Sequence, residues 1–478
     1  MKKIVSLVCA IALVLSMFCV VSTYTASTSY AAPGYPFGIS SAAGDQAAAE
    51  QLLASEWQSW KSTYITSSGA GGFKRVQRDA GTNYDTVSEG LGYGLILAVY
   101  FNEQSLFNDL YGYVKKYQNS RGVMGWHIDA NGNIVSSDGG ENGATDADED
   151  IALALVFAQK RWGTSGSVNY GEEARNLINN IFNHMVERGS YVLKPGDTWG
   201  GSNVTNPSYF SPAWYRVFAE FTGNQEWIKV ADKCYEIVNN IKQYNNNTGL
   251  VPDWCTAQGT ASSGMGYDFK YDAIRYGWRT AIDYSWYGTA AAKTNCDTIT
   301  KFFKNVGVDQ VKDAYTITGN TIGQWHTAAF TSCAAAGAMT GDLATARAFY
   351  DECVKVKDSG SYHYFGNALR MMILLYTTGN FHNMMNGVNP TSNVTPTPVV
   401  TPTPTSTQSG DYVIGDVDGS GSFNSIDYGY VKQYLLGMIK SFPSSKGELA
   451  ADVDKNGAIN SIDFGIMKQV LLAIKSGF

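Results

Sequence analysis

The chain has 478 residues, a formal net charge of −7, and 16% charged and 13% aromatic residues. This length exceeds that of a usual single domain, so we expect more than one folded unit. An acidic chain without a basic cluster is a poor candidate for binding nucleic acid. Its 30 tyrosines and 11 tryptophans exceed the needs of an ordinary core, and they suit surfaces that bind flat, partly apolar ligands such as sugars.

Residues 1–31 have the pattern of a secretory signal peptide. Lys2 and Lys3 precede an apolar stretch, and Ser29 and Ala31 are small residues at the positions that a signal peptidase reads. No later stretch is long and apolar enough to span a bilayer. We therefore expect a secreted, extracellular protein that does not enter the membrane.

The part of the chain after this segment contains five cysteines. They are Cys234, Cys255, Cys296, Cys333 and Cys353. Their number is odd and their spacing matches no metal site, so at least one should be free. We interpret most of them as small buried apolar residues.

The segment 33–387 is predicted to be all-α. Leu53, Trp57, Trp60 and Tyr64, for example, repeat at helical spacing. Twelve segments of this kind are expected to begin near residues 45, 88, 104, 146, 170, 208, 225, 270, 289, 325, 342 and 362. Repeated helix pairs favour a closed ring of six pairs, an (α/α)6 toroid, in which the ends of the inner helices and their loops face one cleft.

Three stretches place acids among glycine, aromatic and apolar residues where a helix is expected to begin. Glu89 lies in SEGLGYG, Asp146 in GATDADEDIALAL and Asp272 in FKYDAIRYGWR. Each acid also has an ordinary structural explanation. The helix dipole could favour Glu89 at a helix start. Thr145 and Asp148 form a T-x-x-D pattern, so Asp148 and the acids after it could belong to a helix cap. Asp272 could form a structural ion pair, since Arg275 and Arg279 share its face of the expected helix.

The glycines around Glu89 argue for more than a helix start. Gly90, Gly92 and Gly94 each cost roughly 0.5–1 kcal/mol relative to alanine within a helix. This loss is understandable if another backbone or a ligand must come close. A glutamate held against such packing would have a raised pKa and could donate a proton. Asp272 could act as a base if water reached its free side and the neighbouring arginine kept it ionised.

Other catalytic schemes fit less well. The sequence has no G-x-S-x-G motif and no glycine-rich phosphate loop. Its histidines lack the H-E-x-x-H spacing of zinc hydrolases; they are His127, His184, His326, His363 and His382. Two convergent carboxyl groups surrounded by aromatic residues are instead the components of a glycosidase.

Four motifs of the segment 33–387 resemble glycoside hydrolase family 8, the family of clostridial cellulosomal endoglucanases. They read YDTVSEGLGYG, ATDADEDIALAL, KPGDTWGG and YDAIRYGWRTAIDYSW. The resemblance implies an (α/α)6 barrel and an inverting mechanism without a cofactor. It makes Glu89 the general acid and Asp272 the general base, places Asp146 where the sugar is bound and distorted, and matches Arg275 to the arginine beside the base.

The same resemblance implies aromatic platforms that bind sugar rings. Trp126, Trp199 and Tyr362 match such positions, and Phe365 stands where relatives often have tyrosine. The implied activity is that of a monomeric endo-β-1,4-glucanase on cellulose and mixed-linkage β-glucans. A xylanase or chitosanase of the same family remains an alternative, and a non-catalytic glycan-binding protein is another.

Residues 388–410 repeat Thr-Pro and are predicted to be a semi-rigid linker. The segment after it, 411–478, contains a 36-residue internal repeat with two oxygen-rich loops that suit Ca²⁺. The candidate ligands are Asp416, Asp418, Ser420, Asn424 and Asp427 in the first copy and Asp452, Asp454, Asn456, Asn460 and Asp463 in the second. The alternative is a pair of polar turns that cap two helices.

This doubled motif resembles a type I dockerin, a small all-α module with paired EF-hand-like loops. The resemblance implies two bound Ca²⁺ ions and attachment to a cohesin domain of a scaffold protein, which would bring the chain to a cell-surface cellulosome. The cohesin-contacting positions correspond to Ser425 and Ile426 in one copy and Ser461 and Ile462 in the other. The identical pairs imply two near-equivalent binding faces. A stand-alone calcium sensor is the alternative.

Overall fold

The computed structural model describes residues 34–164, 166–386, 408–409, 412–471 and 478. The chain divides into two compact units, residues 1–393 and 394–478, and each is described by itself. The predicted signal peptide and nearly all of the predicted linker lie outside the described residues.

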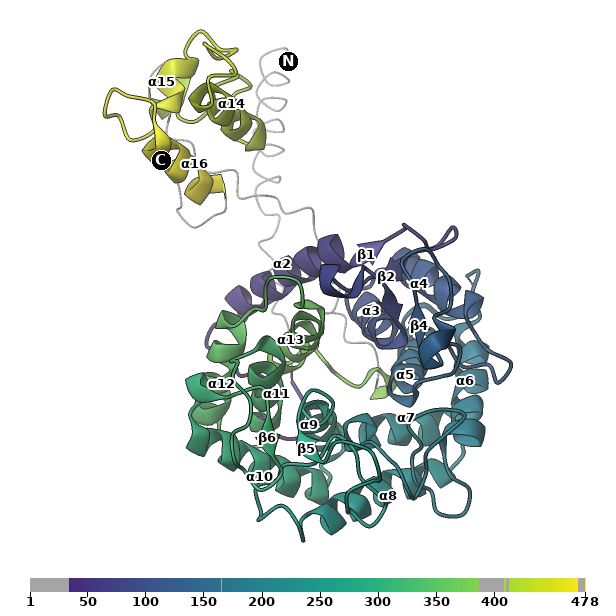
Figure 1. Cartoon of the computed structure of the whole chain (residues 1–478). Helices are drawn as coiled ribbons and strands as arrows, with labels where there is room; N and C mark the ends of the chain where they lie inside the picture. Colours follow the sequence, from purple (N-terminus) through teal and green to yellow (C-terminus); the bar gives the residue numbers. More distant parts are fainter. Residues whose placement is uncertain (1–33, 165, 387–407, 410–411, 472–477) are drawn as a thin grey trace, which may run out of the picture. The chain divides into compact units, whose positions relative to one another are not determined.

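The larger unit is a closed ring of helices, which Figure 1 shows along its axis. Among the described residues, six inner helices are α3 (Ser88–Tyr100), α5 (Thr145–Trp162), α7 (Pro212–Thr222), α9 (Arg275–Tyr287), α11 (Ala328–Ala338) and α13 (Tyr364–Thr377). The outer helices are α2 (Gln46–Tyr64), α4 (Gln104–Lys116), α6 (Tyr170–Met185), α8 (Glu226–Ile241), α10 (Ala290–Val306) and α12 (Leu343–Lys355). Each inner helix contacts the next, and α13 contacts α3. This arrangement confirms the predicted (α/α)6 toroid.

Apolar patterning separates the two layers. The inner helices α3 and α11 are apolar on nearly all sides and bury almost every residue. The outer helix α2 buries one stripe, which includes Leu53, Trp57, Trp60 and Tyr64, and exposes the opposite face. A helix that is apolar all round belongs in the centre and an amphipathic one belongs outside. The hydrophobic pattern therefore determines which member of each pair lies inside.

Two helices begin four or five residues later than the sequence indicates. The helix expected near residue 208 begins at Pro212, because residues 207–209 form a separate 3-10 turn and proline favours the first helical position. The helix expected near residue 270 begins at Arg275. Asp272 therefore lies in the turn before α9 instead of on the helix itself.

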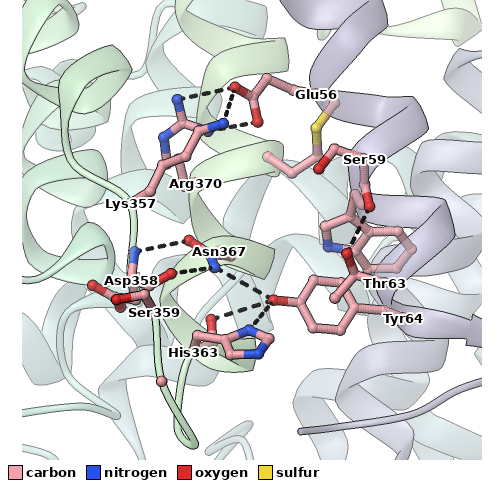
Figure 2. A pocket seen from close by; sticks show the side chains of 13 residues that line it. Glu56, Ser59, Thr63, Tyr64, Lys357, Asp358, Ser359, His363, Asn367 and Arg370 are labelled. Atoms are coloured by element: carbon pink, nitrogen blue, oxygen red, sulfur yellow. Dashed lines mark hydrogen bonds and ion pairs between the residues drawn. The ribbon is translucent and has the colours of Figure 1, made fainter. Parts of the chain in front are cut away.

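The ring closes where α2, the first helix that the structure describes, meets α13, the last helix of the larger unit. Glu56 on α2 pairs with Lys357 at 2.6 Å and with Arg370 on α13 at 3.0 Å. Below this cluster, Tyr64 Oη lies 2.6 Å from His363 Nδ1, and Asn367 donates to the Asp358 carbonyl at 3.0 Å (Figure 2). These bonds surround a cavity of about 370 Å³. They also hold the segment before α13, which forms one wall of the cleft described below.

Short strand pairs hold the loops at the helix starts. β1 (Ile65–Thr66) pairs with β2 (Arg75–Val76), β3 (Thr86–Val87) with β4 (His127–Ile128), and β5 (Asp268–Phe269) with β6 (Tyr315–Thr316), all antiparallel. The 3-10 helices are η1 (Ala80–Thr82), η2 (Ser136–Asp138), η3 (Pro207–Tyr209), η4 (Val308–Gln310) and η5 (Met384–Asn386). Because β3 leads directly into α3, its pairing with β4 fixes the start of that helix.

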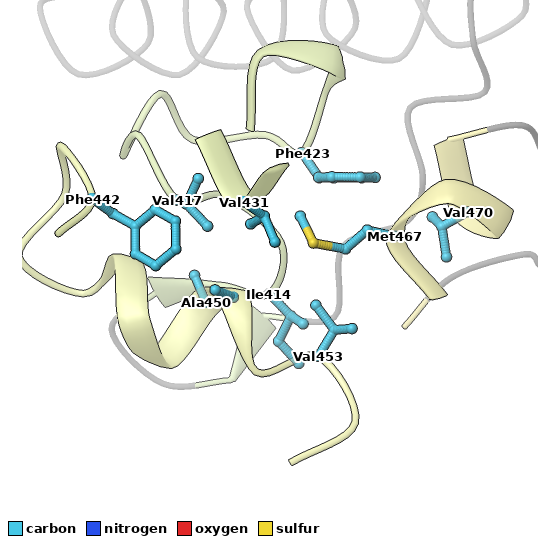
Figure 3. Packing of buried hydrophobic residues seen from close by; sticks show 10 residues of the cluster. Ile414, Val417, Phe423, Val431, Phe442, Ala450, Val453, Met467 and Val470 are labelled. Carbon is cyan, nitrogen blue, oxygen red and sulfur yellow. The ribbon is translucent and has the colours of Figure 1, made fainter. Parts of the chain in front are cut away.

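The smaller unit is built around two similar helices, α14 (Ser425–Leu435) and α16 (Ser461–Leu471). The short helix α15 (Gly447–Ala451) and the strand pair β7 (Gln408–Ser409) and β8 (Tyr412–Val413) complete it. Figure 3 shows its apolar core, to which Val417, Val431 and Met467 contribute fully buried side chains. The two repeat copies therefore share one core.

All five cysteines outside the predicted signal peptide are buried, free thiols. Burial raises the pKa of each of these thiols, so they are kept in the neutral form. No helix in the described ranges is both long and apolar enough to cross a membrane.

Candidate active site

One buried arginine joins the three acids that the sequence singles out. Arg275 Nη1 donates to Glu89 Oε2 at 2.6 Å and to Asp146 Oδ2 at 2.7 Å. Its Nη2 donates to Asp272 Oδ1 at 2.8 Å and to Ser208 Oγ at 3.1 Å. The arginine side chain is only 3% exposed. Acids that lie up to 183 positions apart in the sequence are thus bound to a single guanidinium.

The ring topology explains why these residues meet. Glu89 is the second residue of α3 and Asp146 the second residue of α5, while Asp272 lies in the turn that leads into α9. All three helices are inner helices, and their N-terminal ends lie at the same end of the ring. The backbone N–H of Ser88 donates to the Trp126 carbonyl at 2.9 Å and ties the start of α3 to the neighbouring loop.

Burial controls the protonation of Glu89. It raises the pKa of this carboxyl to about 7; Arg275 opposes the shift, while Asp146 and Asp272 add to it. The larger cause is thus removal from water and the smaller one is repulsion between carboxylates. Tyr364 contributes to the enclosure, since its hydroxyl lies 3.3 Å from Glu89 Oε1.

The glycines of α3 make room for other parts of the protein. A Cβ on Gly90 would lie 2.7 Å from Tyr364 Oη, and a Cβ on Gly92 would lie 2.9 Å from the Cβ of Asp150 on α5. A Cβ on Gly94 would lie 2.9 Å from Val76. The sequence predicts that another backbone or a ligand approaches these glycines, whereas side-chain atoms of the protein lie closest to all three.

Asp272 is more open than Glu89. Its side chain is 35% exposed, compared with 16% for Glu89. Partial burial raises the pKa of Asp272, and the ion pair with Arg275 opposes that shift and favours the ionised form. One carboxyl oxygen binds the arginine while the side chain keeps contact with the cleft, as a base that activates water requires.

A second carboxylate, Asp253, holds the turn that carries Asp272. Asp253 Oδ1 accepts the backbone N–H of Ala273 at 2.8 Å and that of Lys270 at 3.2 Å. Burial raises the pKa of Asp253 to about 6, and these hydrogen bonds oppose the shift. Asp253 therefore holds the backbone of this turn on both sides of Asp272. Nothing in its sequence context, VPDWC, distinguishes it from an ordinary loop acid.

The acids after Asp146 belong to the core. Glu149 and Asp150 pair with Arg279 at 3.3 and 2.8 Å, and all three side chains are at most 1% exposed. Asp148 accepts the backbone N–H of Met124 at 3.0 Å. These acids thus hold neighbouring segments together away from the cleft.

The predicted cap at the start of α5 is wrong. The residue before the helix is Ala144, and its side chain makes no capping hydrogen bond. Thr145 instead donates its hydroxyl to the carbonyl of Lys194 at 2.6 Å. Arg279, which the spacing places on the same face as Asp272, turns to Glu149 and Asp150 because Asp272 precedes the helix.

The cluster of Glu89, Asp146, Asp272 and Arg275 lines a cavity of about 280 Å³ that continues on both sides. On one side, a cavity of about 410 Å³ shares Trp126, Ala144 and Tyr209 with it. On the other, a cavity of about 570 Å³ shares Arg78, Tyr364 and Phe365 with it. Because neighbouring cavities share walls, they form one cleft, long enough for several units of a chain-like ligand.

The predicted aromatic positions all line this cleft. Trp126 borders the central cavity and the one beside it, and Trp199 is 43% exposed, with its ring 5.5 Å from that of Trp254. On the opposite side, Tyr362 is 76% exposed and Phe365 lies 5.8 Å from the Arg275 guanidinium.

Sequence reasoning missed one arginine and two tyrosines of the central cavity. Tyr209 lies 5.3 Å from the Arg275 guanidinium, Tyr364 contacts Glu89, and Arg78 joins the wall while it pairs with Asp85 at 2.6 Å. Tyr209 ends a 3-10 turn and Tyr364 follows the irregular segment before α13. Neither is part of a periodic pattern, so only the fold reveals their position.

The smaller unit contains two equivalent acidic clusters. Carboxylate oxygens of Asp416, Asp418 and Asp427 lie within 4.8 Å of one another, and those of Asp452, Asp454 and Asp463 do the same. Three hard oxygen donors so close together repel each other and fit a cation such as Ca²⁺. The two clusters therefore fit the Ca²⁺ ions that the two loops are expected to bind.

The remaining candidate ligands have other hydrogen bonds. Asn424 and Asn460 accept the backbone N–H of Ile426 and Ile462, each at 2.8 Å, and thereby cap the helices α14 and α16. Ser420 donates to Asp416 at 3.4 Å, and Asn456 donates to Asp454 at 2.8 Å. Their role in holding an ion stays a prediction.

The predicted contact positions for a partner lie on the surface. Ile426 is 59% and Ile462 58% exposed, and Ser425 and Ser461 beside them are exposed as well. Each pair begins the helix that follows its loop. The two pairs therefore present similar small faces, each with one exposed apolar side chain.

The comparisons with known proteins agree with both units. Residues 30–379 match the model of glycosyl hydrolases family 8, and residues 414–472 match the dockerin type I domain. Endoglucanase 2 of Ruminiclostridium josui is 62% identical over 407 residues, and Endoglucanase A of Acetivibrio thermocellus is 59% identical over 403. Both alignments cover 84% of this chain and 83% of the relative.

Solved structures share the ring. The apo structure of a beta-1,3-1,4-glucanase from Paenibacillus sp. X4 matches with a TM-score of 0.67 and 28% identity, over 73% of this chain and 97% of that one. Rex8A from Paenibacillus barcinonensis, complexed with xylose, matches with a TM-score of 0.63 over 71% and 94%. At 22% identity, the second match is evidence for the fold alone.

Proposed function

Because this chain belongs to glycosyl hydrolases family 8 and carries a type I dockerin, we propose that it is a cellulosomal endo-β-1,4-glucanase that inverts the anomeric configuration. Its proposed substrates are internal bonds of cellulose and of mixed-linkage β-glucans. The observation that supports this most is the bridge of Arg275 between Glu89, whose pKa is raised to about 7, and Asp272, inside a cleft lined by aromatic rings.

The proposed reaction divides the chemistry between the two carboxyl groups. Glu89, with a pKa raised to about 7, protonates the glycosidic oxygen as the bond breaks. Asp272 removes a proton from a water that attacks the anomeric carbon from the opposite face. Glu89 leaves the step ionised and Asp272 leaves it protonated, and exchange with solvent restores both.

Arg275 and Asp146 support this step without exchanging protons with the sugar. Arg275 favours the ionised form of Asp272 and remains bound to Glu89 when that group loses its proton. Asp146 shares Nη1 of the arginine with Glu89 and borders the same cavity. We propose that it binds the sugar ring at the cleavage point in a distorted conformation. Inversion also requires the two catalytic carboxyl groups to lie roughly 6.5–9.5 Å apart, so that a water fits between sugar and base.

Proton NMR of the first products tests the mechanism. Hydrolysis of a soluble mixed-linkage β-glucan should release sugars in the α configuration, which then mutarotate. Release of the β anomer would contradict inversion and assign Asp272 the role of a nucleophile. A Glu89→Gln variant that hydrolyses as fast as the wild type would contradict the catalytic assignment, and an inactive wild type would favour a glycan-binding protein.

The substrate class needs a separate measurement. Reducing-sugar release from carboxymethylcellulose, lichenan, xylan and chitosan under one set of conditions compares the proposed activity with the xylanase and chitosanase alternatives. We expect the two glucans to be the better substrates. The aromatic residues Trp126, Trp199 and Phe365 stack on any pyranose, so they support binding of a sugar chain without deciding which one.

We also propose that the enzyme is secreted and that the dockerin attaches it to a cohesin of a scaffold protein. The two acidic clusters would each hold one Ca²⁺, which lets three carboxylates lie close together. The exposed pairs Ser425–Ile426 and Ser461–Ile462 are the proposed cohesin contacts. Their similarity supports binding in either of two orientations.

A further inference from the structure

We propose that Trp325, together with Tyr271, forms an outer sugar platform that extends the cleft beyond Phe365 and favours long glucan chains over short ones. This inference rests on the proposed hydrolysis of β-glucans and adds a binding position to it. Trp325 lies in the loop between α10 and α11 and is 68% exposed.

Single exposed apolar residues are common on proteins, so exposure alone carries little weight. What distinguishes Trp325 is the way its backbone is held. The carboxylate of Asp313, which is 8% exposed, accepts the backbone N–H groups of Gln324 at 2.8 Å and of Trp325 at 2.9 Å on Oδ1. Hydrogen bonds to a carboxylate are stronger than those between neutral groups. The loop is therefore fixed while the indole stays in solvent.

The neighbouring residues reinforce this attachment. A Cβ on Gly323 would lie 2.4 Å from Asp313 Oδ1, so the loop can approach the carboxylate this closely because the residue is glycine. On the other side of Trp325, the His326 ring lies 2.7 Å from the carbonyl of Val311 and 2.9 Å from Glu352. Trp325 is thus an exposed ring between two anchored residues.

Asp313 also connects this loop to the catalytic turn. Its second oxygen, Oδ2, accepts the hydroxyl of Tyr271 at 2.9 Å, and Tyr271 directly precedes Asp272. The Tyr271 ring is 44% exposed and its centroid lies 6.0 Å from that of Phe365. One buried carboxylate therefore positions two exposed aromatic side chains relative to the proposed base.

The cavities make the path continuous. A cavity of about 350 Å³ shares Tyr271 and Trp325 with the 570 Å³ cavity, which in turn shares Phe365 with the central one. A chain leaving the cleavage centre past Phe365 would reach Tyr271 and then Trp325. Flat aromatic faces that keep a polar edge suit pyranose rings, which present C–H groups on their faces and hydroxyls at their rims.

The test compares short and long substrates. Trp325→Ala should reduce kcat/KM for soluble mixed-linkage β-glucan about three- to tenfold, mainly through a higher KM. A change of this size is what the loss of one aromatic contact is expected to cause. It should leave kcat/KM for cellotetraose unchanged, because a short chain at the cleavage centre does not reach the outer cavity. Trp325→Phe should restore most of the loss, since it keeps a stacking surface. Tyr244→Ala, at a tyrosine that is 43% exposed and lines none of the cleft cavities described, is the matched control.

Two outcomes would overturn the platform: unchanged kinetics of Trp325→Ala on the polymer, or an equal loss on short and long substrates, which would indicate a disturbed catalytic turn. A wild-type enzyme inactive on both substrates would contradict the proposed function instead. Calorimetry of cellohexaose binding to Glu89→Gln and to Glu89→Gln/Trp325→Ala tests the platform without turnover. A Kd of the double variant that is about three- to tenfold higher than the Kd of Glu89→Gln supports the platform. Equal Kd values of the two variants, or no binding of cellohexaose to Glu89→Gln, reject it.

Discussion

Arg275 Nη1 lies 2.6 Å from Glu89 Oε2, and yet the pKa of Glu89 is raised to about 7. An adjacent guanidinium normally favours the ionised carboxylate. Here burial under Tyr364 and the α3 packing outweighs the ion pair, and the negative charges of Asp146 and Asp272 add to the shift. Arg275 is therefore shared among three acids, and none of them receives its full effect.

The pH dependence of kcat/KM should follow from this balance. Glu89 must be protonated to act as an acid, so activity should decline above a pKa of about 7 in the free enzyme. Asp146→Asn removes a negative charge that raises the pKa of Glu89, and the alkaline limb should move to lower pH. The residual activity of this variant, measured from pH 4 to 9, checks the direction. An alkaline limb that moves upward or stays unchanged would contradict the proposed role of Glu89.

Gly90→Ala should impair the site without unfolding the ring. The new Cβ would lie 2.7 Å from Tyr364 Oη and 3.0 Å from Val76 Cγ1, and overpacking of this kind costs about 1–3 kcal/mol. Displacement of the Tyr364 hydroxyl removes its hydrogen bond to Glu89, which favours the carboxylate, and also exposes Glu89 to water. Because burial is the largest cause of the raised pKa, the pKa of Glu89 should fall. We expect a several-fold loss of kcat and an alkaline limb at lower pH.

Gly277→Ala is the control for that substitution. Gly277 lies in the inner helix α9, where a Cβ would have its nearest neighbour at an ordinary 3.6 Å. Alanine also favours helix, so this variant should keep its activity and gain up to about 1 kcal/mol of stability. Equal effects of the two substitutions on kcat would show that the contact with Tyr364 does not matter.

Much of the ring can be predicted from the sequence because its signal is periodic. The apolar stripe of α2 and the continuous apolar run of α3 indicate helices, and repeated pairs of such helices indicate the toroid. Glu89 and Asp146 stand at helix starts, which inner helices bring to one end of the ring. Local pattern and topology together therefore suffice for these two acids.

Residues in irregular segments could not be placed in this way. Spacing alone puts Asp272, Arg275 and Arg279 on one helical face, but Asp272 precedes α9 and Arg279 binds other acids. Tyr364 reaches Glu89 across 275 positions, through a contact that no periodicity encodes. Long-range contacts of this kind depend on how loops close, and a single sequence gives no measure of that.

Arg279→Met should destabilise the larger unit strongly. It would leave Glu149 and Asp150 without their cation in a site that is at most 1% exposed. Removal of one partner from a buried ion pair costs about 3–5 kcal/mol. Chemical denaturation monitored by tryptophan fluorescence measures the change. At low pH Glu149 and Asp150 become protonated and no longer need a cation. The loss in the free energy of unfolding should therefore become smaller as the pH falls.

Lys293→Ala provides the comparison on the surface. Lys293 pairs with Asp297 at 2.7 Å, but both side chains are at least 40% exposed. Such pairs contribute about 0–1 kcal/mol, so this variant should unfold almost like the wild type. A loss for Arg279→Met no larger than that for Lys293→Ala would contradict the structural role given to the buried cluster.

Calcium removal should inactivate the dockerin and spare the hydrolase. Without an ion, the clustered carboxylates of Asp416, Asp418 and Asp427 repel each other, so EDTA should loosen the loop and abolish capture by an immobilised cohesin. Hydrolysis of soluble β-glucan should persist, because the proposed acid and base need no metal. Loss of both functions at the same EDTA concentration would contradict this separation.

The two helix starts of the dockerin should substitute for each other in cohesin binding. Ile426 and Ile462 are 59% and 58% exposed and occupy equivalent positions in α14 and α16. Ile426→Asp or Ile462→Asp alone should leave one intact face and reduce cohesin affinity only about twofold, since half of the binding orientations remain, and two equal orientations differ from one by about 0.4 kcal/mol. The double substitution should weaken capture at least a hundredfold, because a buried unpaired charge is costly at either face. Surface plasmon resonance in calcium measures both effects, and circular dichroism verifies that the variants still fold. A single substitution as severe as the double one would show that the dockerin binds through one face.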